Sequence, residues 1–396
     1  QEVFSHLLDL LGAANAEFRQ KALGLLLDVV RTFDLEADES VTRRSIDQIV
    51  AKLAEKKETF EYSEFIWQVL QKCLRAKKYA LAAILTTALA LRRRIARDVT
   101  VYDSITVKKV FDSFDQSVFI PQLVYDLTSA DFETASRIRE ILVATGSEAV
   151  AMELSKVISH PKRQIRQQAL KVLGELGKAS LNVFSQILAD DAMFRREEGC
   201  ASLSNERWYV VRNSIFVMGL LEDAGAISYL KMRISDPDVR VRHEIIRALE
   251  KIGGEEACDL LMMMANDPSE EVRDLAVITI GLIGSHDVAP LLIDLAQANP
   301  PVTLKAISAL GKLGGRQAEA YLIRALEDSV TFAGLVSTDV SRDDLSLAVI
   351  KALGQIGDQR AIDSIKEFKN SQSTAQKLFF KNSPVNRAIS QIISQR

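Results

Sequence analysis

The chain has 396 residues, of which 47% are hydrophobic and 6% aromatic, and its formal net charge is −3. Its 18 glycines and 8 prolines are few for this length, which argues against a disordered chain and against a turn-rich β fold. No apolar run reaches the roughly 20 residues that a membrane-spanning helix needs, so we expect no span.

The three cysteines, Cys73, Cys200 and Cys258, lie far apart and form neither a CxxC pair nor a disulfide framework. The absence of paired cysteines in the sequence therefore favours a reducing compartment. No signal peptide is visible, so we expect a cytoplasmic protein. The chain begins at Gln1 rather than at a methionine, which leaves a removed upstream segment open.

Residues 1–116 are predicted to form a less regular α-helical N-terminal module. A degenerate helix pair is expected near residues 3–30, followed by helices over 39–56, 62–75 and 78–97, with no convincing period among them. This module is expected to cap the array that follows, because the terminal unit of a repeat array needs a polar outer face.

Residues 117–396 contain an internal repeat, which is clearest in residues 235–253, SDPDVRVRHEIIRALEKIG. Asp236-Pro237 ends one helix, and apolar residues then recur at helical spacing from Val241. Gly253 is expected to end the second helix in the left-handed conformation that glycine tolerates best. Copies of the second helix begin about 30 residues apart, with occasional insertions. The pattern predicts an all-α fold, a right-handed α-solenoid of helix pairs.

Two insertions interrupt this period, at residues 191–207 and 329–344. Both fall between the first and the second helix of a repeat, so we expect them on the same edge of the solenoid. Long loops in a compact array are often functional, and a neutral surface insertion is the alternative.

The Asp-Pro-x-x-x-Val-Arg turn and the Leu-Gly-x-Leu/Ile-Gly helix ending resemble HEAT repeats, in the short form also found in phycobilisome-lyase-like proteins. The resemblance implies a ladder of side chains between neighbouring repeats that is structural rather than catalytic. Thr303 and Ser346 replace the arginine in the later repeats. The residues that match the ladder are Arg166, Arg212, Asp236, Arg242, Asp267 and Arg273.

No catalytic or metal-binding motif accompanies the repeats. Deoxyhypusine hydroxylase, a family of similar repeats, holds two irons with several His-Glu dipeptides, whereas this chain has one, His243-Glu244. Cys200 lies beside Arg195 and Arg196 in the first insertion, and we interpret it as a loop cysteine without a catalytic role. We therefore expect no enzyme activity, no cofactor and no metal.

Positions of the second helices that the core does not use are expected to line a concave partner-binding face. Over these positions in six repeats, apolar residues lie among six basic and three acidic ones; the charged residues are Lys171, Arg247, Lys251, Lys305, Lys312 and Lys351, with Glu175, Glu244 and Asp274. The residues assigned to this face are Val217, Leu221, His243, Glu244, Arg247, Lys251, Leu275, Ile278, Leu282, Lys305, Lys312 and Lys351.

Apolar groups ringed by charge suit a peptide or an amphipathic helix, so the sequence favours a scaffold or adaptor that binds another protein, of unknown identity. Binding of nucleic acid or of an acidic ligand is the first alternative. The basic excess is small for phosphate binding, and no aromatic residue occupies these positions to stack on bases. The second alternative is a lyase or chaperone for a cofactor protein.

Overall fold

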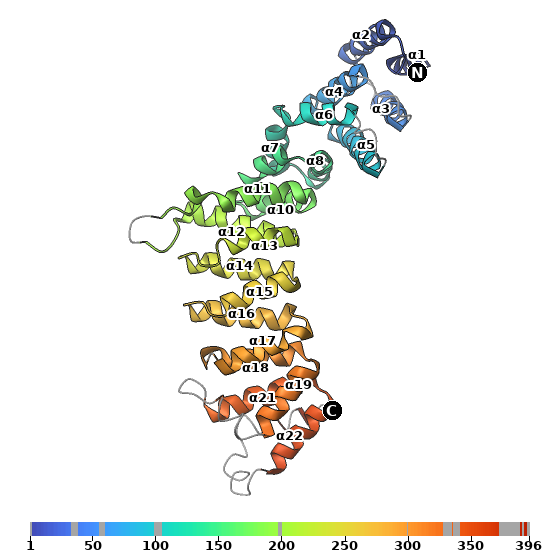
Figure 1. Cartoon of the computed structure of the whole chain (residues 1–396). Helices are drawn as coiled ribbons and strands as arrows, with labels where there is room; N and C mark the ends of the chain where they lie inside the picture. The colour runs from blue at the N-terminus through green and yellow to red at the C-terminus, as the bar shows by residue number, and fades with distance from the viewer. Residues whose placement is uncertain are drawn as a thin grey trace. The chain divides into compact units, whose positions relative to one another are not determined.

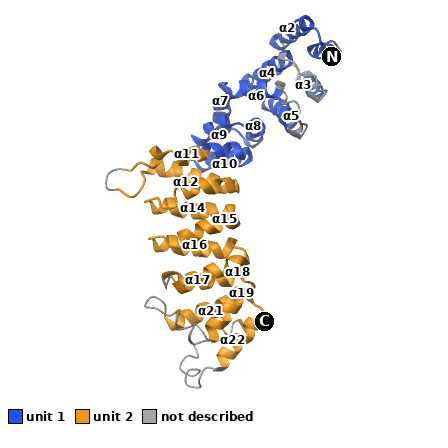
Figure 2. Cartoon of the chain, viewed as in Figure 1, with its two compact units in different colours: residues 1–183 blue, residues 184–396 orange. Residues whose placement is uncertain are grey.

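The computed structural model describes residues 2–32, 39–54, 60–98, 105–196, 200–298, 300–327, 335, 341–371, 389 and 392–393. The described residues are helical or connect helices, and no strand occurs among them. The chain divides into two compact units, residues 1–183 and 184–396 (Figure 2). This division does not coincide with the boundary between residues 116 and 117 that we expected from the sequence.

The N-terminal part of unit 1 consists of α1 (Glu2–Leu11), α2 (Ala16–Thr32), α3 (Glu39–Ala54), α4 (Phe60–Arg75), α5 (Tyr79–Asp98) and α6 (Ile105–Asp115). Each helix buries one apolar stripe, such as Phe65, Ile66 and Leu70 in α4. The odd-numbered helices pack on one another and so do the even-numbered ones. Although the sequence shows no period here, these helices form a two-layered array of pairs.

The order of the layers reverses in the second part of unit 1. It contains α7 (Phe119–Ser129), α8 (Phe132–Thr145), α9 (Glu148–Ser155) and α10 (Arg163–Leu176). Both α6 and α7 belong to the layer of α4, because α7 packs on α6 and then on α9. In the other layer α8 packs against α5 and then against α10. The first helices α7 and α9 therefore continue the layer that is formed by the second helices α2, α4 and α6.

The helix α11 (Lys178–Ala189) crosses the boundary between the units, and the repeats of unit 2 follow (Figure 1). Second helices stack directly on one another in the order α12 (Asn205–Leu220), α14 (Val239–Ile252), α16 (Glu270–Ile283), α18 (Thr303–Leu313) and α21 (Arg342–Ile356). The other layer consists of first helices, α13 (Ile227–Lys231), α15 (Gly254–Met264), α17 (Ala289–Ala298), α19 (Gly315–Glu327) and α22 (Gln359–Ser371). The predicted solenoid of helix pairs is confirmed.

The core lies between the two layers and is formed by the positions that the period predicts. In α14 the side chains of Val241, Ile245, Ala248 and Leu249 are all buried. Gly253 ends this helix with φ +66° and ψ −167°, so its φ is positive as expected, although its ψ lies outside the left-handed helical region.

Small residues set the distance between successive second helices. A Cβ atom at Gly281 of α16 would lie 2.6 Å from the Cα atom of Ala309 in α18. Gly219 and Gly311 approach the next second helix in the same way, at Ala248 and Ala352. Glycine is therefore required at these positions for the helices to pack this closely.

Among the residues that the structure describes, no helix is both long enough and apolar enough to cross a membrane.

Candidate partner-binding face and the repeat ladder

The ladder that the resemblance implies is present between two repeats of unit 2. Arg242 of α14 donates from Nε to Oδ2 of Asp267 over 2.7 Å and from Nη2 to Oδ1 over 2.9 Å. Both side chains are buried, and the Asp267 carboxylate also accepts from the backbone N–H of Ser269 at 2.8 Å. Two parallel hydrogen bonds fix the orientation of one repeat relative to the next.

The ladder arginines also bind the turn in front of their own helix. Arg242 donates to the carbonyl oxygens of Asp236 and Pro237, six and five residues earlier. The same two bonds recur from Arg166 to His160 and Pro161, and from Arg273 to Asp267 and Pro268. Each arginine therefore fixes the proline-containing turn that enters its helix.

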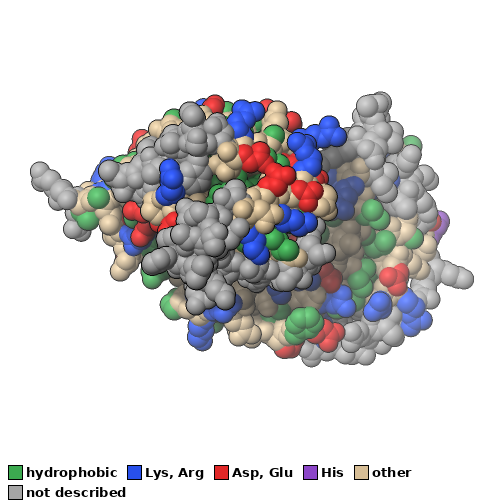
Figure 3. Space-filling model, turned by 90° about the horizontal axis from the view of Figure 1, so that it is seen from below, with side chains coloured by type: hydrophobic (Ala, Val, Ile, Leu, Met, Phe, Trp, Pro, Cys, Tyr) green, Lys and Arg blue, Asp and Glu red, His purple; other side chains and the backbone are tan. Residues whose placement is uncertain are grey.

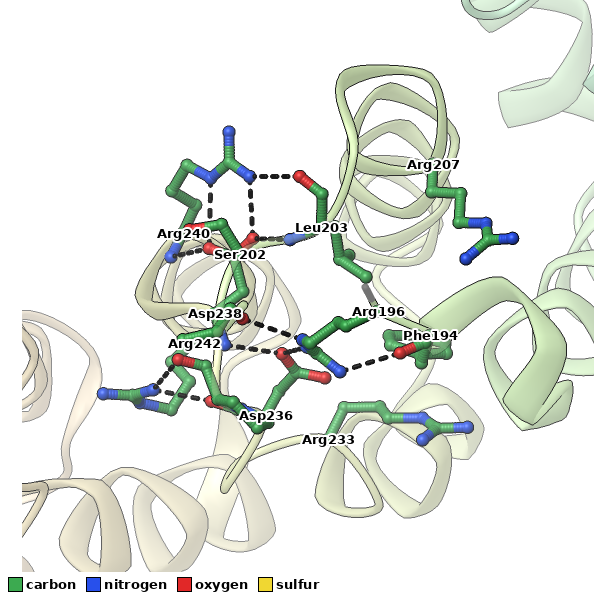
Figure 4. Close-up of polar contacts among 12 residues, drawn as sticks. Phe194, Arg196, Ser202, Leu203, Arg207, Arg233, Asp236, Asp238, Arg240 and Arg242 are labelled. Carbon is green, nitrogen blue, oxygen red and sulfur yellow. Dashed lines mark hydrogen bonds and ion pairs between the residues drawn. The ribbon is translucent and has the colours of Figure 1, made fainter. Parts of the chain in front are cut away.

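Arg212 does not take the ladder position that the sequence assigned to it. The residues five and six positions earlier lie inside α12, where there is no turn to bind, because the first insertion displaces the turn. Arg196 of the insertion instead donates from Nη2 to the Asp236 carboxylate (Figure 4). Asp236 also accepts from the N–H of Asp238, just as Asp267 accepts from Ser269. Arg196 is thus the structural equivalent of Arg242.

Aromatic and polar contacts fasten the beginning of the first insertion to unit 2. Arg233 donates to the carbonyl oxygen of Leu188 at 2.9 Å and pairs with Asp191 at 2.8 Å. Its guanidinium carbon lies 3.7 Å from the centre of the Phe194 ring. Arg196 donates to the carbonyl oxygen of Phe194 at 2.7 Å. Residues 191–196 are therefore bound to the repeat that follows.

Asp238 fastens the end of the same insertion. Its carboxylate accepts from the N–H of Leu203 at 2.8 Å and from the guanidinium of Arg240 at 2.8 Å and 3.0 Å (Figure 4). Arg240 in turn donates to the carbonyl oxygen of Leu203 and lies over the Trp208 ring. Burial alone would raise the pKa of Asp238, but these hydrogen bonds and the charge of Arg240 outweigh it, so the pKa is lowered.

Most of the second insertion lies outside the described residues. Leu335 is described and buried, and Ser341 begins α21 by accepting from the N–H of Asp344 at 3.1 Å. This is an N-cap, which satisfies one of the free N–H groups of the first turn. Both insertions lie between a first and a second helix, as the sequence predicts.

The structure places most of the residues that we assigned to the partner-binding face on the outside of the second helices. Arg247, Lys251, Leu282, Lys312 and Lys351 are exposed. Half-buried side chains lie beside them; they are Leu221, His243, Leu275, Ile278 and Lys305.

Two of the assigned residues are wrongly placed. Val217 has no exposed surface, and Glu244 is 4% exposed, so neither offers a surface to a partner. Helical periodicity distinguishes the core side of a second helix from its opposite side. It does not show which residues on that opposite side are covered by the neighbouring repeat. The Glu244 carboxylate accepts a hydrogen bond from Arg247 at 3.1 Å, which compensates its burial.

A groove between α12 and α14 contains the basic pair that the sequence singled out. Its volume is about 480 Å³. The groove is lined by Arg212, Phe216, Glu244, Arg247, Ala248, Glu250 and Lys251. Sequence reasoning missed Arg212, Phe216 and Glu250 as groove residues, because the register treated Arg212 as part of the ladder and gave no signal for the other two.

The cations of this groove have different surroundings. Arg247 pairs with Glu244, and the Lys251 ammonium lies 4.1 Å from the centre of the Phe216 ring. Arg212 forms no hydrogen bond or ion pair with any residue that the structure describes. In the next groove Lys305 pairs with Asp274 at 3.2 Å. Arg212 and Lys251 are therefore the cations available to an acidic group.

The basic run near the end of α5 has a structural role within unit 1. Arg93 donates to the carbonyl oxygens of Thr145 and Ala144 at the end of α8, at 2.7 Å and 3.1 Å. On the face drawn in Figure 3, the coloured Lys and Arg side chains lie among Asp and Glu side chains and form no continuous basic field. Among the described residues no group of three or more potential metal ligands comes together.

Several solved structures resemble this chain at low identity. A crystal structure of Kap121p bound to Nup53p is 12% identical with a TM-score of 0.44, and the alignment covers 99% of this chain and 45% of that one. The chain therefore spans less than half of that relative. The complex of CpcE and CpcF of phycocyanin lyase from Nostoc sp. PCC7120 is 18% identical with a TM-score of 0.30, covering 62% and 94%. Human deoxyhypusine hydroxylase is 14% identical with a TM-score of 0.26, covering 72% and 97%.

No curated protein matches the chain in sequence. Family models do match within unit 2. HEAT repeats match residues 197–274 and 263–336, and the PBS lyase HEAT-like repeat matches residues 347–371. These segments contain the second helices α12, α14, α16 and α18, most of α21, and the Arg242–Asp267 pair described above. The chain is therefore a HEAT-repeat protein.

Proposed function

We propose that this protein is a non-enzymatic scaffold that binds another protein on the outer side of its second helices α12, α14, α16, α18 and α21. The observation that carries the proposal is the surface composition of these helices. Leu282 is 54% exposed and lies one repeat from Lys251 and one repeat from Lys312, both of them exposed. An exposed apolar residue between cations favours a protein ligand.

Nucleic acid fits this surface less well. Lys305 and Arg247 are already paired with Asp274 and Glu244, so fewer cations are available than a phosphate backbone usually engages. Phe216, the aromatic residue of the groove, is half-buried with the Lys251 ammonium over its ring, which disfavours stacking on a base.

An affinity capture with matched variants tests the proposal. The bait is the whole chain, either unchanged or carrying Leu282→Glu with Lys312→Glu. The control carries Met263→Glu with Arg324→Glu, which makes the same chemical changes on the first helices α15 and α19. Met263 is 53% exposed, so it matches Leu282 closely.

We expect a partner protein that wild type and the control retain and that the second-helix variant loses. Equal retention by both variants would place the binding surface elsewhere. Recovery of material that nuclease removes would support the nucleic-acid alternative instead. Melting curves of the three baits serve as the control that each of them is folded.

A further inference from the structure

We infer that the second helices of unit 2 bind an extended segment of a partner protein in which two acidic residues flank an apolar one, with three residues from each to the next. This inference rests on the proposed function and specifies the ligand of the same surface. The first acidic residue enters the groove between α12 and α14, and the apolar residue contacts Leu282.

The groove is able to take a carboxylate because the insertion releases Arg212. In the following repeat Arg242 is paired with Asp267, to which it donates two hydrogen bonds. Asp236, the equivalent acceptor for Arg212, is taken by Arg196. Arg212 therefore lines the same groove as Lys251, with no partner among the described residues. A guanidinium and an ammonium facing one groove can bind a carboxylate together.

The other charges of the groove leave these two cations available. Glu244 is buried and paired with Arg247, so this pair is neutral as a unit. Glu250 is exposed and is the remaining acid of the lining. The lining of the groove therefore carries two available cations and one exposed acid, a net charge of +1. This favours binding of an acidic side chain over a basic one, and it is too small for binding a nucleic-acid backbone.

The repeat determines the order of contacts along the ligand. Lys251, Leu282 and Lys312 occupy equivalent positions in α14, α16 and α18, which pack side by side. A ligand that crosses these helices therefore meets a cation, an apolar side chain and a second cation. Lys312 has no ion-pair partner in the part of the chain that the structure describes.

The spacing of the ligand follows from the spacing of the helices. Packed helices lie about 8–10 Å apart, and a polyproline II segment advances about 3.1 Å per residue with about three residues per turn, so every third side chain faces the same side. Each step from one second helix to the next therefore corresponds to about three residues of a ligand in the polyproline II conformation. The segment that fits has the pattern Glu-x-x-Leu-x-x-Glu, where either acid can be aspartate.

Fluorescence polarisation with synthetic peptides tests this pattern. The probe is fluorescein-labelled Gly-Glu-Ser-Ser-Leu-Ser-Ser-Glu-Gly, and the reference is the same composition in the order Gly-Glu-Glu-Ser-Ser-Ser-Ser-Leu-Gly. We expect the whole chain to bind the probe more tightly than the reference at low salt. Arg212→Glu should weaken binding of the probe by on the order of tenfold, since it replaces attraction by repulsion. Arg212→Lys should weaken binding less, because it keeps the charge and loses the paired hydrogen bonds.

Arg324→Glu on α19 is the matched control, since it makes the same change of charge on a first helix and should leave probe binding unchanged. Equal binding of the two peptides would overturn the inference. It would also be overturned if Arg212→Glu had no effect, or if a short DNA duplex bound more tightly than the probe. A different result would contradict the proposed function itself, namely an affinity capture in which the second-helix variant retains the same partner as wild type.

Discussion

Arg242 and Asp267 are 25 residues apart in the chain, and two hydrogen bonds of 2.7 Å and 2.9 Å between their buried side chains connect two repeats. Removing one member of a buried ion pair leaves the other charge without compensation. The junction is therefore a point at which a single substitution should weaken the contact between neighbouring repeats.

We predict that Asp267→Ala lowers the free energy of unfolding by about 3–5 kcal/mol, since Arg242 stays buried without its carboxylate. Urea denaturation followed by circular dichroism measures the loss. Arg273→Ala is the control, because this arginine donates only to backbone carbonyl oxygens in the described structure, and it should cost about 1 kcal/mol. Similar losses from both substitutions would contradict the special role of the ion pair.

Gly281→Ala should destabilise unit 2. The new Cβ atom would lie 2.6 Å from the Cα atom and 2.7 Å from the Cβ atom of Ala309, so α16 and α18 would have to move apart. Overpacking costs about 1–3 kcal/mol, and contact with the backbone puts this site toward the upper end. The gain in helix propensity, about 1 kcal/mol, offsets only part of the cost.

Gly24→Ala is the matched control for Gly281→Ala. Gly24 lies inside α2, and a Cβ atom there would meet nothing within 4 Å. We expect this substitution to raise the melting temperature slightly, through a gain of about 0.5–1 kcal/mol. A melting temperature that does not fall for Gly281→Ala would show that the two helices can separate without cost.

Asp238 should make the attachment of the first insertion sensitive to acid. Its folded-state pKa is lowered, because the hydrogen bonds from Arg240 and Leu203 outweigh its burial. A group of this kind contributes stability above its unfolded pKa of about 3.9, and the contribution is lost as the pH falls through the folded pKa. The loss therefore begins below about pH 4.

Hydrogen exchange at the N–H of Leu203 reports this attachment directly, because that group donates to Asp238. We expect its protection to decrease below about pH 4 in wild type relative to other buried amides. In Asp238→Asn the protection should be low already at neutral pH and should show no such acid step. An acid step of equal size in the variant would assign the titration to another group.

The three cysteines should differ sharply in reactivity. Burial raises the pKa of Cys73 to about 12, and burial together with the charges of Asp259 and Glu255 raises the pKa of Cys258. Cys200 is exposed. Because the thiolate is the reactive form, the native protein should react with Ellman's reagent at Cys200 alone, and the denatured protein at all three. Rapid reaction of a second thiol would contradict the packing of α4 or α15.

The sequence predicts the helices and the core well because both follow from a local period. Val241, Ile245 and Leu249 recur on one side of α14, and all three are buried. The pair of α1 and α2 was predicted near residues 3–30, but the pairing of α3 to α6 was not. Their apolar residues depend on contacts between helices of unequal length, which leave no fixed period in the sequence.

The candidate site was only partly predictable, because it depends on contacts between repeats. Val217 and Glu244 occupy outer positions by register, yet both are buried. The role of Arg212 depends on Arg196, a residue of the insertion that no repeat position could identify. What the sequence did indicate is the Arg247–Lys251 pair, since both line the groove.

The central claim is that a partner protein binds the outer side of the second helices. Site-specific photocross-linking tests it most directly, with p-benzoylphenylalanine replacing Leu282 in one protein and Met263 in another. The two positions are exposed to nearly the same extent, 54% and 53%, and lie on α16 and α15. The account predicts a cross-linked protein from position 282 and none from position 263. Cross-linking from position 263 alone, or equally from both, would contradict it.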